Sequence, residues 1–154
     1  MYHYTDSGLD NIYLLNGFTV EETPYGRAVS IEDVDRLHDA IGRKLIERTS
    51  PLRGKELRFL RHELDLSQKR LGQLLGVSDQ TVARMEKRLR RIDPIMDRMV
   101  RGLYRECKQG SSGLLDLVRS LAEADHKEAE EIKLEKTNNS WRITQRCGRQ
   151  CACG

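Results

Sequence analysis

The first part of the chain alternates short apolar runs with turn signals. Residues 12–15 and 18–20 are apolar runs on either side of an Asn-Gly pair at 16–17. Asn-Gly favours a tight type I′ hairpin, because both residues tolerate positive φ. A second turn signal at 24–26 precedes residues 28–31, which predict a third short strand.

Apolar positions three and four residues apart next predict an amphipathic helix. It is expected to begin at Ser30 or Glu32 and to end before Pro51, because proline disfavours helical geometry in the residue that precedes it. The positions on its apolar face are Val34, Leu37, Ala40, Ile41, Leu45 and Ile46. We therefore expect residues 1–51 to form a small β-plus-helix module.

The middle of the chain, residues 52–108, has helical periodicity and almost no strand signal. A helix is expected over residues 54–64, and Ser67 and Ser78 are good N-caps for two further helices. Asp93, followed by a proline, caps a fourth helix. The residues expected to be buried in the first and last of these helices are Leu57, Phe59, Leu60, Leu64, Ile95, Met99, Val100 and Leu103.

The last third begins with a hinge of small residues at 109–113. Residues 114–136 predict a long amphipathic helix, and residues 137–154 predict a polar, flexible tail. The apolar positions of the long helix are Leu114, Leu117, Val118, Leu121, Ala122, Ala129 and Ile132. The fold class expected for the whole chain is mainly α.

Composition restricts the class of protein. The 154 residues are 33% charged and 5% aromatic, which suits a small domain with appendages. No apolar run approaches the ~20 residues that a membrane span needs. The first ten residues lack the basic-then-apolar plan of a secretory signal. We therefore expect a soluble cytoplasmic protein without membrane association, whose four cysteines are reduced.

Charge is distributed unevenly along the chain. Residues 1–51 contain five Lys/Arg and nine Asp/Glu, a net charge of −4. Residues 52–108 contain fifteen and eight, a net charge of +7, whereas residues 109–154 are neutral with seven of each. A basic segment between acidic and neutral flanks is typical of a polyanion-binding domain with attachments. The alternative is a helical surface that basic residues merely keep soluble.

The most informative stretch is residues 68–85. Two helices packed through a short turn need a small residue where they cross and a turn residue that tolerates positive φ. Gly72 and Gly76 stand at those two positions. The apolar residues that would join the helices are Leu71, Leu75, Val77, Val82 and Met85. An ordinary αα-corner without a role in DNA binding is the alternative interpretation.

Residues 66–86, LSQKRLGQLLGVSDQTVARME, resemble the helix-turn-helix segment of the phage repressor/Cro (XRE) family. The resemblance extends over about residues 54–106 and implies a five-helix, repressor-like DNA-binding domain. The family's usual Trp-Glu-x-Gly after the second helix of the motif is here Met-Glu-Lys-Arg at 85–88.

An N-terminal hairpin and helix joined to such a domain also resembles the MqsA-type antitoxins of bacterial toxin–antitoxin pairs. In that family the N-terminal module holds a zinc ion through cysteines. Residues 1–106 contain no cysteine, so this metal site is not expected here.

The second helix of the motif lies in the major groove with its N-terminal residues at base edges. Asp79, Gln80 and Arg84 are therefore the candidate base-reading residues. Arginine can form a bidentate contact with guanine and glutamine with adenine, and aspartate can accept a hydrogen bond from cytosine. Alternatively, Asp79 does not contact DNA bases and only caps the helix.

A second set of residues is expected to contact phosphates. Gln68 resembles the family's phosphate-binding glutamine at a helix N-terminus, where free backbone N–H groups also favour an anion. The other candidates are Lys69, Ser78, Thr81, Lys87, Arg88, Arg90 and Arg91. A solvated charged face is the alternative for the basic residues.

These observations predict a sequence-specific transcriptional regulator that binds double-stranded operator DNA, in the form of a dimeric autorepressor. The expected self-association surface is 94–106, 114–136 or both, although the second stretch does not keep a strict heptad. The alternative function is an antitoxin, whose acidic residues 1–51 would cover a small basic toxin.

Enzymatic and metal chemistry have little support. The four histidines are scattered, and no phosphate loop, Rossmann fingerprint or HExxH motif is present. Cys147, Cys151 and Cys153, near His126, lack the paired C-x2-C spacing of structural zinc sites. We expect no catalytic activity, no metal and no cofactor.

Overall fold

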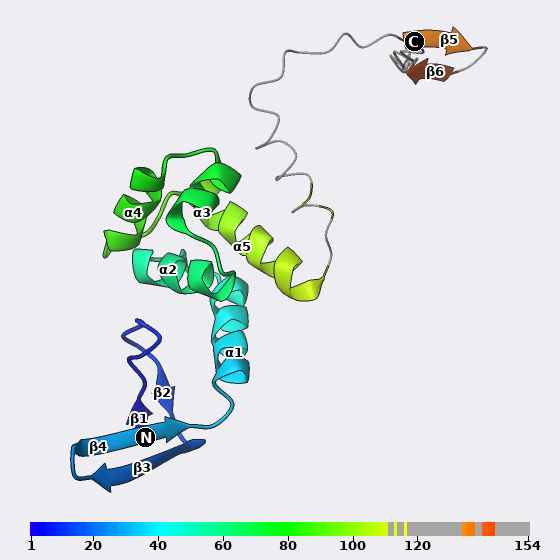
Figure 1. Ribbon diagram of the computed structural model, residues 1–154. Helices are drawn as coiled ribbons and strands as arrows, with labels where there is room; N and C mark the ends of the chain where they lie inside the picture. The colour runs from blue at the N-terminus through cyan, green and yellow to red at the C-terminus, as the bar shows by residue number, and fades with distance from the viewer. Residues whose placement is uncertain (111–112, 114–115, 117–133, 138–139, 144–154) are drawn as a thin grey trace, which may run out of the picture. The chain divides into compact units, whose positions relative to one another are not determined.

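The computed structural model describes residues 1–110, 113, 116, 134–137 and 140–143 (Figure 1). The chain divides into two compact units, residues 1–123 and residues 124–154.

Two separate antiparallel strand pairs form the beginning of the first unit. Strand β1 (Tyr2–His3) pairs with β2 (Tyr13–Leu14), and β3 (Phe18–Thr23) pairs with β4 (Gly26–Ile31). The turn signal at 24–26 is confirmed, because Thr23 lies opposite Gly26 in the register.

The hairpin predicted at Asn16-Gly17 is wrong. Gly17 has a φ of +74°, but Asn16 is not among the residues with positive φ, and the strands on either side have other partners. Pairing with β1 buries Leu14 in the core and places the Tyr2 ring centroid 5.3 Å from that of Phe18. These non-local contacts outweigh the local turn preference.

Helix α1 (Val34–Glu47) follows β4 and, in Figure 1, runs from the end of that strand toward α2. It begins later than predicted because Ser30 belongs to β4 and the N-cap is Asp33, which has a φ of +49° in the left-handed region. The helix ends before Pro51 as expected. Its buried residues include Ile41 and Leu45, whereas the predicted apolar positions Val34 and Ala40 are exposed.

The next four helices are α2 (Gly54–Glu63), α3 (Gln68–Leu75), α4 (Asp79–Lys87) and α5 (Pro94–Gln109). The three predicted caps are confirmed, because the side-chain oxygens of Ser67, Ser78 and Asp93 accept backbone N–H bonds at the first turns of α3, α4 and α5. With α1, the described residues contain five helices. The first comes from the N-terminal third, outside residues 54–106.

The prediction that Ile95 is buried in α5 is wrong. Ile95 is 65% exposed, and Met96 instead packs partly against the core. The Asp93 cap determines where the first turn of α5 begins, and this turn directs Ile95 to solvent.

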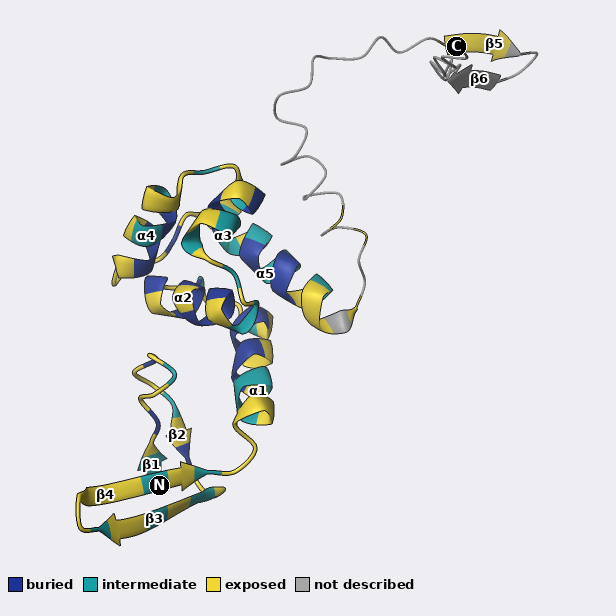
Figure 2. Ribbon diagram, viewed as in Figure 1, coloured by how far each residue is buried: buried dark blue, intermediate teal, exposed yellow. Residues whose placement is uncertain are grey.

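A continuous hydrophobic core connects strands β1 to β4 with helices α1 to α5 (Figure 2). Tyr4, Leu9 and Leu14 from the strand region share it with residues of each helix. The largest fully buried side chains are Tyr104, Leu52, Leu57, Leu60, Leu71, Leu103, Val82 and Val100.

The second unit contains a strand pair where the sequence analysis placed a helix end and a flexible tail. Strand β5 (Leu134–Thr137) pairs antiparallel with β6 (Ser140–Ile143). In the register Lys136 lies opposite Trp141 and Leu134 opposite Ile143, a strand pairing that the helical periodicity of the preceding residues does not reveal. Gly113 and Asp116 are helical, and the predicted apolar positions from Leu114 to Ile132 lie outside the described residues. None of the helices described has the length and apolar character needed to cross a bilayer.

Candidate nucleic-acid interface

The corner between α3 and α4 is formed by the two glycines that the sequence singled out. Gly76 ends α3 with a φ of +69°, in the left-handed region that favours glycine. Gly72 faces the backbone of the turn, where an added Cβ would lie 2.7 Å from the carbonyl oxygen of Val77. The Val77 N–H also donates to the Gly72 carbonyl at 2.9 Å. The turn therefore requires a residue without a side chain at Gly72.

The apolar residues predicted to join these helices do so. Leu71, Val82 and Met85 are buried, and Leu75 and Val77 pack partly against the same core. This packing fixes one face of α4 and leaves its opposite face in solvent.

A buried ion pair that the sequence analysis missed connects α2 with α4. Arg61 and Glu86 are each 7% exposed, and the Arg61 guanidinium donates through Nε and Nη2 to the Glu86 carboxylate. Nη1 of Arg61 donates to the carbonyl oxygen of Leu66 at 2.8 Å. A sequence signal for this pair was available. Arg61 lies four positions after the buried Leu57 and Glu86 four positions after the buried Val82, so each charged residue falls on the buried face of its helix.

Gln68, a predicted phosphate-binding residue, is part of this network. Its Nε2 donates to Oε2 of Glu86 at 2.8 Å. The side-chain amide of Gln68 is thereby held in one orientation at the N-terminus of α3.

Two of the three predicted base-reading residues present unengaged side chains on α4. Gln80 and Arg84 are exposed, four residues apart, and neither side chain makes a hydrogen bond or ion pair with the part of the chain that the structure describes. Asp79 is also exposed, but its Oδ1 accepts from the backbone N–H of Gln80 at 2.8 Å. Its carboxylate therefore already stabilises the N-terminus of the helix.

The predicted hydroxyl contacts are engaged with each other. Ser78 Oγ accepts from the Thr81 N–H at 3.1 Å and lies 2.9 Å from the Thr81 Oγ1. Both hydroxyls lie at the first turn of α4, beside Asp79 and Gln80.

The predicted basic residues are all exposed, and most are near one another along the chain. Lys87 and Arg88 end α4, and Arg90 and Arg91 follow in the loop that leads to α5. Lys69 instead lies on the first turn of α3. The loop is held by backbone hydrogen bonds to the region that precedes α2, so its position relative to α4 is fixed.

Within the described residues, no group of three or more His, Cys, Asp or Glu side chains is arranged to hold a metal ion. Cys147, Cys151, Cys153 and His126 lie outside those residues.

A helix-turn-helix family model matches residues 57–96. These residues extend from α2 through the α3–α4 corner to the beginning of α5. Neither the curated proteins nor the solved structures contain a significant match to the chain. Residues 57–96 are therefore a helix-turn-helix domain of the XRE family.

Proposed function

We propose that this chain is a transcriptional regulator that reads operator DNA with α4 and represses its own operon as a dimer in the cytoplasm. The helix-turn-helix domain is that of a DNA-binding regulator. The observation that carries the finer proposal is the exposed face of α4, on which Gln80 and Arg84 lie four residues apart with unengaged polar groups among the described residues.

Readout follows from the chemistry of these side chains. A guanidinium can donate two hydrogen bonds to guanine O6 and N7, and a carboxamide can pair with adenine N6 and N7. Arg84 is thus the candidate reader of guanine and Gln80 that of adenine. Asp79 contributes to base readout only if its second oxygen, Oδ2, accepts from cytosine while Oδ1 remains on the Gln80 N–H.

Phosphate contacts would orient α4 in the groove. The N-terminus of α3, with Gln68 and Lys69, and the basic residues after Met85 lie on either side of the helix along the chain. Such contacts supply most of the affinity without sequence information.

A dimer would place two copies of α4 on half-sites about one helical turn of DNA apart. Residues 94–106, which begin with the 65% exposed Ile95, are part of the proposed contact between copies.

Replacement of Arg84 tests this function. Arg84→Ala is expected to weaken binding to the selected operator by ~1–3 kcal/mol and to relax specificity at one base pair. Lys87→Ala is the matched control, because loss of a phosphate contact weakens binding to every sequence alike. Selection from a random DNA pool identifies the preferred sequence, and titration with operator and random DNA measures the affinity of both variants. Equal losses on operator and random DNA would exclude Arg84 as a base-reading residue.

An antitoxin function remains the second candidate. The β3–β4 hairpin exposes Glu21 and Glu22, and neither strand has another partner among the described strands. An acidic hairpin with open edges suits a basic protein that adds a strand. Co-purification with the products of neighbouring genes tests this function, which requires a partner of at least micromolar affinity.

A further inference from the structure

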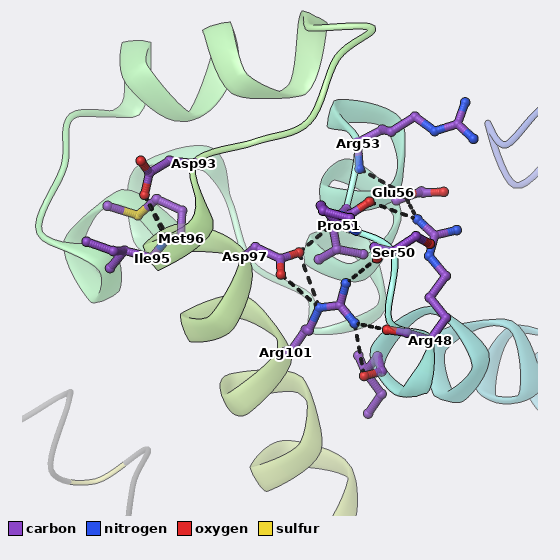
Figure 3. Close-up of polar contacts among 12 residues, drawn as sticks. Arg48, Ser50, Pro51, Arg53, Glu56, Asp93, Ile95, Met96, Asp97 and Arg101 are labelled. Atoms are coloured by element: carbon purple, nitrogen blue, oxygen red, sulfur yellow. Dashed lines mark hydrogen bonds and ion pairs between the residues drawn. The ribbon is translucent and has the colours of Figure 1, made fainter.

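An open cavity of about 670 Å³ lies where the segment between α1 and α2 meets the loop after α4. Its lining comprises Arg48, Ser50, Pro51, Arg53, Leu89, Arg90 and Arg91. We call it the arginine pocket. Figure 3 shows the part of it that Arg48, Ser50, Pro51 and Arg53 contribute.

The charge of the arginine pocket is mostly uncompensated. The Arg48 guanidinium is neutralised, because Nη2 forms an ion pair with Glu56. The side chains of Arg53, Arg90 and Arg91 make no hydrogen bond or ion pair with any described residue, and the carboxylate that interacts electrostatically with Arg53, Asp10, lines the neighbouring cavity instead. No lining residue carries a carboxylate. Three cationic groups around one cavity repel one another, and a bound anion removes that cost.

Other cavities of the first unit differ in this respect. Three of them contain at least one carboxylate each among their lining residues. These carboxylates are Asp10 and Glu56 in one, Asp39 and Glu47 in the second, and Asp6, Glu63 and Glu86 in the third. The arginine pocket is therefore the member of this group that suits an anion.

The backbone beneath the arginines is fixed before any ligand binds. The Gly54 N–H donates to the Arg88 carbonyl at 3.2 Å, and the Ile92 N–H donates to the Leu52 carbonyl at 3.0 Å. Arg53 and Arg91 also form an isolated antiparallel bridge. A preformed site loses little conformational entropy when it binds its ligand.

The arginine pocket lies next to the end of α4, because Leu89, Arg90 and Arg91 follow that helix. Gln80 and Arg84 lie one turn apart on the exposed face of α4, and Arg88 is the extended C-cap after Lys87. At the end of α4, an added Cβ on Gly54 would lie 2.4 Å from the carbonyl oxygen of Met85 and 2.5 Å from that of Arg88. The start of α2, where Arg53 stands, therefore abuts the end of α4.

We infer that the arginine pocket binds a phosphodiester of DNA next to the bases that α4 reads, and that Arg53 contacts this phosphate together with Arg90 and Arg91. Arginine binds phosphate oxygens through two parallel N–H groups and keeps its charge at any physiological pH. The inference rests on the proposed function, since α4 brings the DNA to the pocket. Arg53 lies outside the matched helix-turn-helix segment and adds a contact to it.

A salt titration of full-length Arg53→Gln tests the inference. The substitution removes the charge but keeps the backbone N–H of Arg53, which donates to Glu56 Oε2 at 2.8 Å. The slope of log K against log salt is expected to become shallower by about 1, with the preference for operator over random DNA unchanged. Arg36→Gln is the control, because Arg36 is 87% exposed on α1 and lies outside the pocket. Its slope should equal that of the wild type.

A wild-type slope for Arg53→Gln overturns the inference, provided that the melting temperature of the variant is unchanged. Tripolyphosphate is the probe for a free phosphate ligand. Suppose that the wild type binds tripolyphosphate, that Arg53→Gln abolishes this binding, and that the substitution leaves the salt slope of DNA binding unaltered. This result also overturns the inference and assigns the pocket to a small phosphorylated ligand. A third result separates the two proposals. If Arg53→Gln makes the salt slope shallower but the wild-type protein prefers no DNA sequence in the random pool, the phosphate site is supported and the proposed function is contradicted.

Discussion

At the scale of single residues, Gly42 of α1 packs closely against Tyr104 of α5. A Cβ added to Gly42 would lie 2.0 Å from the Tyr104 hydroxyl oxygen and 2.5 Å from Cζ. Tyr104 is 1% exposed, and its hydroxyl has no hydrogen-bond partner among the described residues. The helices thus approach closely at the expense of one unsatisfied polar group.

Tyr104→Phe is expected to stabilise the protein by about 1 kcal/mol, because it removes a buried hydroxyl without a partner. Burial also raises the pKa of Tyr104 above its usual value of 10.0. The unfolded chain therefore loses this proton first, and stability falls as the pH rises from about 10 through the folded pKa. The variant should lack this part of the alkaline loss, which urea denaturation at neutral and alkaline pH measures.

Tyr25→Phe is the matched control, because Tyr25 is fully exposed. It should change the free energy of unfolding by less than about 0.5 kcal/mol. A Tyr104→Phe variant that is clearly less stable than the wild type would show that the hydroxyl has a bound partner, such as an internal water molecule.

Local residue preferences were predictable. Ser67, Ser78 and Asp93 act as caps because their short side chains reach backbone N–H groups two or three residues ahead. Gly76 is required by the φ of its own backbone. The role of Gly42 was not predictable, since its partner is 62 positions away in the sequence and nothing local marks it.

At the scale of elements, the buried Arg61–Glu86 pair connects α2 with α4 in addition to the core that they share. Glu86 accepts from both Arg61 and Gln68, so it connects three helices at one carboxylate. A buried charge without its partner is costly, because the protein interior does not solvate it as water does.

Glu86→Gln is expected to lower the free energy of unfolding by about 3–5 kcal/mol, since it leaves the buried guanidinium of Arg61 uncompensated. Glu47→Gln, on the exposed side of α1, is the control and should cost less than about 0.5 kcal/mol. Chemical denaturation of both variants measures the difference. A loss below about 1 kcal/mol for Glu86→Gln would mean that water reaches the pair.

Helices were predicted more accurately than strand partners. The periodicity of α2 and α5 is a property of each segment alone, and the caps define where the helices begin. Strand pairing depends on which segments meet, so the Asn-Gly signal at 16–17 misled the prediction although residues 18–20 and 28–31 are strands. The β5–β6 pair was missed because a helix whose last apolar position was Ile132 was extended to residue 136.

At the scale of the molecule, α5 holds the segment between α1 and α2 (Figure 3). Asp97 Oδ1 accepts from the Leu52 N–H at 2.8 Å. The Arg101 guanidinium donates to the carbonyl oxygens of Ile46, Arg48 and Ser50 at 3.2, 2.6 and 2.7 Å. The N-terminal third is therefore joined to the helix-turn-helix domain by polar contacts as well as by the core.

Arg101→Ala is expected to release this segment, because three carbonyl groups lose their donor at once. Trypsin should then cleave after Arg48 or Arg53 several-fold faster, and stability should fall by about 1–3 kcal/mol. Limited proteolysis with mass spectrometry identifies the sites. Arg105→Ala, an exposed position on the same helix, is the control. Unchanged cleavage in Arg101→Ala would show that the hydrophobic core alone orders the segment.

The sequence by itself determined the elements whose signals are local: the caps, the helical faces, the Gly72 and Gly76 corner and its resemblance to the XRE family. Backbone conformation and side-chain spacing within some twenty residues are sufficient for these features. Only the tertiary structure decided which distant groups meet, such as Glu86 with Arg61, α5 with the α1–α2 segment, and Arg53 with Arg90 and Arg91. Such meetings depend on packing and charge compensation across the whole fold, and these act between positions that no local pattern connects.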